Sequence, residues 1–226
     1  MVRNDAVAAI TGEIFHEGWS RVRGSRQGLG AKRTQMVRAA RGHRSAVFKA
    51  IRGGGTHTKA QLTRQLEYLT TKSSHIVDSR AELDGKRSLN ADEIGELADR
   101  FTARWDDGFN PKLGHTTHLL MSYPVGTSGE DVRDISAAVA ERFFATEERT
   151  FDYVIAVHED RDHPHAHLVI NRRAQQGEYF YLGRDHHFNY DDFRQAMVEE
   201  AETVGLRLEA TRRVDRGVLT YPARTG

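Results

Sequence analysis

The 226-residue chain contains no cysteine, only four prolines and no long apolar run. Without cysteine it cannot form disulfides, bind a metal through thiolates or use a thiol as a nucleophile, so any metal must bind histidine or carboxylate side chains. No apolar run reaches the roughly 18 residues that cross a bilayer, and the N-terminus lacks the continuous apolar segment of a secretory signal. We therefore expect a soluble protein that is not secreted, with one sizeable core.

Basic charge is concentrated at the N-terminus. Residues 1–44 hold nine Lys or Arg against three Asp or Glu, whereas the remaining 182 residues hold 24 against 29. Glycines such as Gly30 and Gly42 would interrupt a helix in this segment. We predict a basic N-terminal arm or leader over residues 1–44 and one domain over residues 45–226. A nucleic-acid contact and a solvated, partly disordered tail have the same composition, so both interpretations of the arm stay open.

Strand and helix patterns alternate along the rest of the chain. Strands are predicted over residues 45–51, 115–123, 151–158 and 165–172, with shorter ones over 178–182 and 206–210. Helices are predicted over residues 58–69, 94–105, 132–143 and 193–204, the first of them capped by Thr56 or Thr58. Residues 72–90 look polar and irregular. This order predicts an α+β domain, with a largely antiparallel β-sheet and helices mainly on one face.

Three histidines occupy strand positions that would bring their side chains together. His165 and His167 are two residues apart in a predicted strand, so both side chains point to one face. His158 ends the preceding strand, and a tight hairpin would place it opposite that pair. Three imidazoles with an open fourth position are typical of a catalytic metal site. A single histidine near a turn is more often a surface residue, but three at this spacing favour a metal site.

Two neighbours of this cluster have more than one interpretation. Asp160 could orient a ligand histidine, take a proton from a nucleophile, or serve only as a turn residue. His163 lies beside Pro164, where a contact with solvent or DNA is favoured over a fourth ligand position.

Tyr68 lies outside the apolar stripe of its predicted helix. Leu62, Leu66 and Leu69 form that stripe, whereas the tyrosine projects away from it with Arg64 and Lys72. A phenol with a pKa near 10 needs a metal, a base or cationic neighbours before it can attack a phosphate, and this sequence offers all three. An exposed tyrosine without a catalytic role stays the alternative at this point.

Three segments, in the order QLEYL, THLLMSYPVGT and HEDRDHPHAHLVINRR, closely resemble the conjugative relaxases of the HUH endonuclease superfamily. Within that superfamily the resemblance is closest to the T-DNA border endonuclease (virulence relaxase) type, and it covers residues 45 to about 222. It implies a palm-like sheet, the HUH relaxase fold, with Tyr68 as the nucleophile and Asp160 as a supporting catalytic residue. The implied ligands of a divalent cation, Mg²⁺ or Mn²⁺, are His158, His165 and His167.

The resemblance also implies contacts with DNA. Ser122 matches the serine that positions the strand, and we expect Arg172 and Arg173 to contact the DNA backbone. Arg64, one turn before Tyr68, completes the predicted DNA-binding set.

The implied function is that of a site- and strand-specific DNA endonuclease and strand transferase. Such an enzyme nicks single-stranded DNA at an origin of transfer or border repeat, forms a 5′-phosphotyrosine link and pilots the strand through type IV secretion in conjugation. Expected partners are accessory DNA-processing and secretion-coupling proteins, and the expected location is the bacterial cytoplasm, with export alongside the transferred DNA. Three alternatives stay open: a metal-dependent phosphoesterase that uses water, a DNA-binding module with a structural metal, and a replication initiator of the same superfamily.

Overall fold

The computed structural model describes residues 29–106, 108–212 and 215. They fall into two compact units: one contains the described residues between 47 and 182, and the other contains the described residues before 47 and after 182. Residues 1–28 of the predicted arm lie outside the described residues. The arm over residues 1–44, and its boundary with one domain over residues 45–226, therefore stay predictions.

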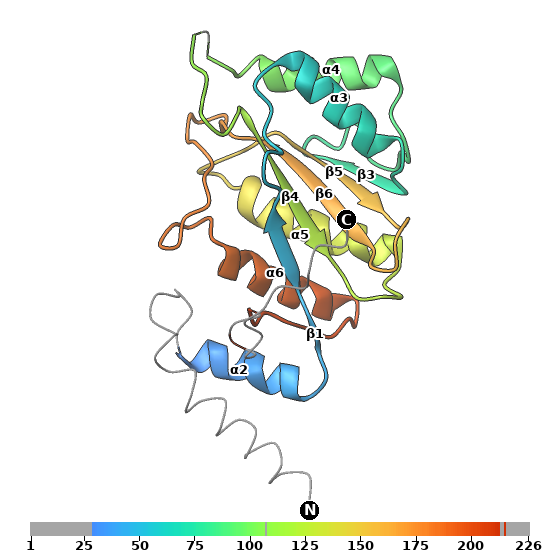
Figure 1. The fold of residues 1–226 in the computed structure, drawn as a ribbon, viewed down its shortest axis with the longest axis vertical. Helices are drawn as coiled ribbons and strands as arrows, with labels where there is room; N and C mark the ends of the chain where they lie inside the picture. Colours follow the sequence, from blue (N-terminus) through green and yellow to red (C-terminus); the bar gives the residue numbers. More distant parts are fainter. Residues whose placement is uncertain (1–28, 107, 213–214, 216–226) are drawn as a thin grey trace, which may run out of the picture. The chain divides into compact units, whose positions relative to one another are not determined.

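A five-stranded antiparallel sheet forms the centre of the 47–182 unit (Figure 1). Its strands, in spatial order, are β2 (Val47–Ala50), β4 (Thr116–Ser122), β6 (His165–Asn171), β5 (Tyr153–His158) and β3 (His75–Asp78). The hairpin predicted between residues 158 and 165 is present, because β5 and β6 pair along their whole length up to His158 opposite His165. The predicted α+β class and antiparallel sheet are confirmed.

Helices α3 (Lys59–Thr70) and α4 (Ala91–Thr102) cover one face of this sheet. Thr58 is the N-cap of α3, where its hydroxyl accepts a hydrogen bond from the backbone N–H of Gln61. The predicted leucine stripe of α3 is buried against apolar residues of α4 and the sheet. The members of this core are Leu62, Leu66, Leu69, Ile76, Ile94, Leu97, Ala98, Phe101, Val154, Ala156 and Val169.

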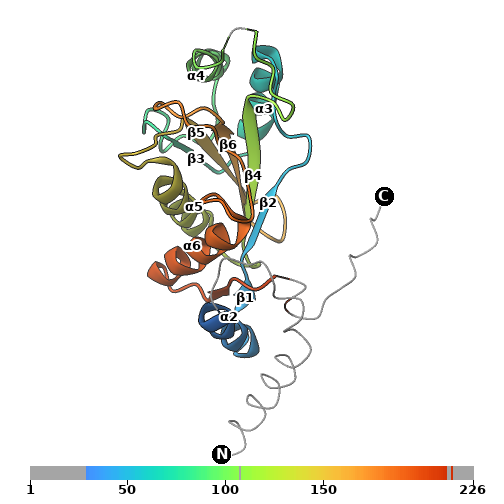
Figure 2. The same ribbon diagram turned by 90° about the vertical axis from the view of Figure 1, so that its left-hand side faces the viewer.

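Helix α5 (Gly129–Phe144) packs on the opposite face, where it contacts β3, β5 and β6. Its Phe144 ring lies 6.0 Å from that of Tyr153, which points away from the α3 side because side chains alternate along a strand. The strands therefore lie between the α3–α4 pair and α5 (Figures 1 and 2). Helices cover both faces of the sheet rather than mainly one. All six residues of β5 are buried, so the side chains on both faces of this strand are covered.

Two local predictions in this unit are wrong. Residues 72–90 contain β3, whose apolar residues Ile76 and Val77 are too few to produce a strand pattern, so pairing with β5 specifies this strand. Residues 178–182 form no strand but contribute one isolated bridge, between Tyr179 and Arg173.

The second unit contains α2 (Leu29–Ala40), β1 (Arg44–Ser45), α6 (Tyr190–Thr203) and β7 (Leu208–Glu209), with β1 and β7 parallel. Buried Gln35 joins α2 to the rest of the unit, since its amide donates to Gln195 and accepts from the backbone N–H of Ala210. The expectation that glycines prevent a helix here is wrong. Gly30 lies in the first turn of α2, and Gly42 follows its end with a φ of 83°, a conformation in which glycine terminates helices. None of the helices in the described ranges is long and apolar enough to span a membrane.

Candidate functional site

Three histidines from the central hairpin converge on one face of the sheet. His158 ends β5 directly opposite His165, and His167 pairs with Ala156 two residues further along the strands. Their ring centroids are 4.7 to 5.3 Å apart. One ring nitrogen of each lies within 4.8 Å of those of the other two, which is a spacing suited to a single metal ion.

The second nitrogen of two of these rings is held by a backbone carbonyl. His158 donates from Nε2 to the carbonyl of Leu69 at 2.7 Å, and His165 donates from Nδ1 to the carbonyl of His163 at 3.1 Å. A carbonyl can only accept, so each of these nitrogens carries the hydrogen. The lone pairs are thereby left on Nδ1 of His158 and Nε2 of His165, ready to bind a cation.

The third ring, His167, has a partner that the sequence analysis missed. Nδ1 of His167 lies 2.8 Å from Nε2 of His118 in β4, the neighbouring strand. The amide nitrogen of Gln65, on α3, lies 3.4 Å from Nδ1 of His118. The sequence could have predicted this position of His118. In a strand every second side chain points to the same face, so residues 118, 120 and 122 share one face, which is the face that carries Ser122.

Burial favours the uncharged form of His118, His165 and His167 by lowering their pKa values. It is the largest cause that lowers the pKa of His167 to about 3 and that of His118 to about 4, with neighbouring histidines adding to the effect. Burial also lowers the pKa of His165, although nearby Asp160 acts in the opposite direction. Neutral rings at pH 7 keep their lone pairs for coordination.

Tyr68 lies in the last turn of α3, directly before the residue whose carbonyl holds His158. Its side chain is 64% exposed, and the ammonium group of Lys72 lies 5.8 Å from the centre of its ring. Arg64 is exposed one turn earlier on the same helix. The end of α3 therefore presents an accessible phenol among cations, next to the histidine cluster.

Ser122 and Asp160 lie at the same end of the sheet. Half-buried Ser122 pairs with His165 across β4 and β6, on the face of the three histidines. Asp160 is exposed in the turn between β5 and β6, and within the described part of the chain no hydrogen bond joins it to His158, His165 or His167.

Arg172 and Arg173 follow the other end of β6, beyond Asn171, so the structure does not bring them to the histidines. Arg172 is only 7% exposed, and its guanidinium donates to the carbonyls of Phe180 and Gly114. Arg173 is partly exposed and is paired with Asp106. The geometry gives Arg172 a structural role in holding two loops, which leaves Arg173 as the more accessible of the two.

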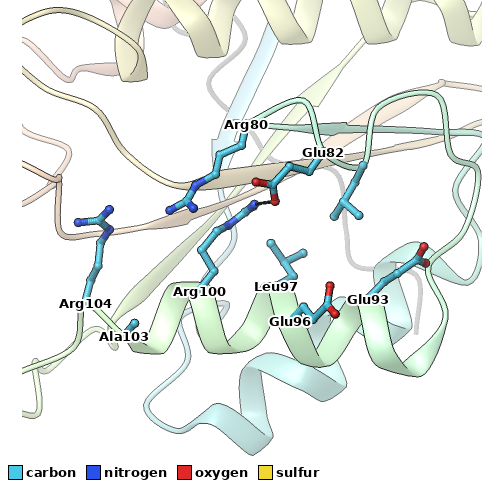
Figure 3. Close-up of a pocket in the computed structure, with 9 residues that line it drawn as sticks. Arg80, Glu82, Glu93, Glu96, Leu97, Arg100, Ala103 and Arg104 are labelled. Carbon is cyan, nitrogen blue, oxygen red and sulfur yellow. Dashed lines mark hydrogen bonds and ion pairs between the residues drawn. The ribbon is translucent and has the colours of Figure 1, made fainter.

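A cavity of about 540 Å³ lies beside α4 (Figure 3). Its charged lining residues are largely paired: Arg100 contacts Asp78 and Glu82, and Arg104 donates to buried Asp152 at 2.7 Å. None of the three histidines lines it. The cavity is therefore separate from the candidate metal centre.

Comparisons with known proteins identify the family of this chain. The family model described as "Relaxase: MobA/VirD2-like, nuclease domain" matches residues 68–206. The T-DNA border endonuclease VirD2 of Agrobacterium fabrum is 35% identical over 192 residues, which are 78% of this chain and 41% of the relative. The protein of the same name from Rhizobium radiobacter is 34% identical over 189 residues, 78% of this chain and 44% of the relative.

The chain thus spans about two fifths of the length of the curated relatives it matches. A solved structure described as "Molecular Basis of Vancomycin Resistance Transfer in Staphylococcus aureus" overlaps 74% of this chain and 99% of its own, with a TM-score of 0.41 and 14% identity. The family match covers more than half of the chain, and with it the tyrosine and the three histidines. The chain belongs to the MobA/VirD2-like relaxase nuclease-domain family.

Proposed function

We propose that this protein is a relaxase: a metal-dependent, site- and strand-specific DNA endonuclease and strand transferase. One observation carries the proposal. The carbonyl of Leu69 binds His158, so the end of the helix that carries the exposed Tyr68 lies against a cluster of three histidines, one ring nitrogen of each within 4.8 Å of those of the other two. Family membership supports DNA as the substrate.

His158, His165 and His167 would hold the cation. The donor set fits a divalent ion, since three neutral imidazoles leave further coordination positions open. When bound, the cation would polarise a phosphoryl oxygen of the scissile phosphate and neutralise the charge that develops during attack. All three ligands are nitrogens, which suit Mn²⁺ better than Mg²⁺ because Mg²⁺ prefers oxygen ligands.

Tyr68 would supply the nucleophile. Its phenolic oxygen forms a bond to the scissile phosphorus while the bond from phosphorus to the 3′ oxygen breaks, giving a 5′-phosphotyrosine and a free 3′ hydroxyl. The phenol gives up its proton, for which exposed Asp160 is our candidate acceptor, and the leaving 3′ oxygen takes one up. Lys72, whose ammonium lies 5.8 Å from the centre of the Tyr68 ring, adds positive charge beside the nucleophile. Since one ester replaces another, the reverse reaction reseals the strand.

Strand positioning would involve Ser122, next to the cluster, and Arg64, next to the nucleophile. Arg173 is a candidate phosphate contact further along β6, whereas buried Arg172 would act by holding the loops around it. By analogy with relatives named T-DNA border endonucleases, the substrate is single-stranded DNA at an origin of transfer or border sequence. Piloting of that strand through type IV secretion, with accessory and coupling proteins, completes the proposed role.

Trapping the covalent intermediate tests this function. The protein is incubated with Mn²⁺ and a library of single-stranded genomic fragments, and the DNA attached to it is isolated under denaturing conditions and sequenced. We expect adducts that share one junction sequence. Tyr68→Phe should abolish them, while Tyr181→Phe, which changes another exposed tyrosine, should leave them intact. Cleavage without an adduct would instead indicate a phosphoesterase that uses water.

A further inference from the structure

We propose that His118 is a positioning residue of the metal centre, which holds His167 in the tautomer and orientation that direct Nε2 of His167 toward the cation. The inference rests on the proposed metal site. His118 acts on a ligand rather than as one, because its Nε2 is engaged with Nδ1 of His167.

Strand register brings the two rings together. β4 pairs with β6 so that His118 lies opposite Val169, and side-chain alternation puts His118 on the face that carries His167. From this diagonal position the two ring centroids are 4.9 Å apart, and the nitrogens meet at 2.8 Å. His118 is buried, whereas His167 is half-buried.

The position of the hydrogen in this contact decides whether His167 can bind a metal. A neutral imidazole has one N–H and one lone pair, so one of the two rings must donate to the other. If Nδ1 of His167 donates, its Nε2 keeps the lone pair that a cation needs. If Nε2 of His118 donates instead, the hydrogen of His167 must sit on Nε2 and coordination there is blocked. Metal binding therefore requires His118 to accept, with its own hydrogen on Nδ1.

The amide of Gln65 lies where that second hydrogen would point. Its amide lies on the Nδ1 side of His118, where its nitrogen donates to the carbonyl of Gly54 at 2.8 Å. The amide oxygen, Oε1, is buried and has no hydrogen-bond partner. In this orientation the amide nitrogen, 3.4 Å from Nδ1 of His118, would face a hydrogen on that atom, so the metal-binding tautomer requires the Gln65 amide to turn and present this oxygen. Gln65 belongs to α3, so this chain of contacts links the helix of Tyr68 to the metal ligand.

The backbone before α3 passes close to the Cβ of His118. A Cβ added to Gly54 would lie 2.6 Å from the Cβ of His118, closer than real Cβ contacts come. Only glycine lets the segment between β2 and α3 close over this histidine. The close approach of Gly54 therefore helps to fix where the side chain of His118 begins.

Mn²⁺ titrations by calorimetry test the proposal. His118→Leu removes the acceptor, and we expect Mn²⁺ affinity to fall by about 10- to 100-fold. His118→Gln keeps an oxygen that can accept from Nδ1 of His167, so its affinity should stay within a few-fold of wild type. The matched control is His115→Leu, which removes another buried histidine, one stacked on Trp105 away from the cluster; it should bind Mn²⁺ like wild type.

A second readout needs no substitution. Long-range ¹H–¹⁵N spectra of histidine-labelled wild-type protein with Zn²⁺, a diamagnetic ion that imidazole binds well, give the tautomer of His167 directly. We expect a hydrogen on Nδ1 and the ion on Nε2. The opposite tautomer, or unchanged Mn²⁺ affinity in folded His118→Leu, would overturn the role of His118 while leaving the metal site intact. Failure of the wild-type protein to bind either ion would remove the metal site and this inference together.

Discussion

The carbonyl of Leu69 accepts a hydrogen bond of 2.7 Å from Nε2 of His158. Leu69 lies in the last turn of α3, where carbonyl groups have no partner within the helix. His158 therefore donates a hydrogen bond to a carbonyl group that has no partner within the helix. The same hydrogen bond places the hydrogen of His158 on Nε2 and leaves a lone pair on Nδ1. Through this one contact, the helix that carries Tyr68 is fastened to the candidate metal centre.

Removal of a ligand should remove metal-dependent stabilisation. Because a cation that binds only the folded state raises the free energy of unfolding, Mn²⁺ at about 100 times its dissociation constant should stabilise wild type by about 2.7 kcal/mol. His165→Ala should lose most of this gain, measured by thermal unfolding with and without Mn²⁺. His163→Ala is the matched control, since the carbonyl that holds His165 belongs to the backbone and survives the substitution. Equal stabilisation of both variants would contradict the ligand assignment.

Mn²⁺ should support adduct formation at lower concentrations than Mg²⁺. The reason is the all-nitrogen ligand set, which suits Mn²⁺ better than the oxygen-preferring Mg²⁺. Protein stripped with a chelator and dialysed should form no phosphotyrosine adduct, and graded additions of each ion should restore it. Full activity of the stripped protein in the presence of excess chelator would argue against a metal-dependent reaction.

Arg64→Gln should weaken the binding of single-stranded DNA and reduce its salt dependence. An arginine that neutralises one phosphate of a single strand contributes about 0.7 to the slope of log affinity against log salt. Fluorescence anisotropy at salt concentrations between about 50 and about 200 mM measures that slope. Arg133→Gln is the control, because Arg133 lies on α5, which covers the opposite face of the sheet, and pairs with Asp134. An unchanged slope in Arg64→Gln would place the phosphate contacts elsewhere.

Gly55→Ala should be strongly destabilising. An added Cβ would overlap the carbonyl oxygen of Leu113 and lie 2.8 Å from that of Thr116, so the backbone must move. We expect a loss of about 2 kcal/mol or more in the free energy of unfolding, measured by urea denaturation. Gly95→Ala, inside α4 with no atom within 4 Å of the added Cβ, should stabilise by about 0.5–1 kcal/mol. Similar values for the two variants would contradict this account of the close approach.

Local sequence pattern is sufficient to identify much of the candidate site. The two-residue spacing of His165 and His167 and the charged turn after His158 predict a hairpin with three imidazoles on one face, and β5 and β6 pair in that register. The helical spacing of Leu62, Leu66 and Leu69 places Tyr68 on the exposed side of α3, where it lies. These features depend on periodicities of a few residues, which the chain carries regardless of its surroundings.

Features that depend on contacts between distant segments were decided only by the tertiary structure. The strand at 75–78 exists because β5 pairs with it, and α5 covers the second face because β5 is apolar on both sides. Arg172 is predicted from the sequence to contact the DNA backbone, but in the structure its side chain is buried and donates to two backbone carbonyls. His118 lies 49 residues from His167 along the chain, and only the register of β4 beside β6 brings their rings to 2.8 Å. The sequence by itself determined which side chains could form the site, and the packing of strands and helices decided which of them meet, because strand pairing acts over distances that no local pattern encodes.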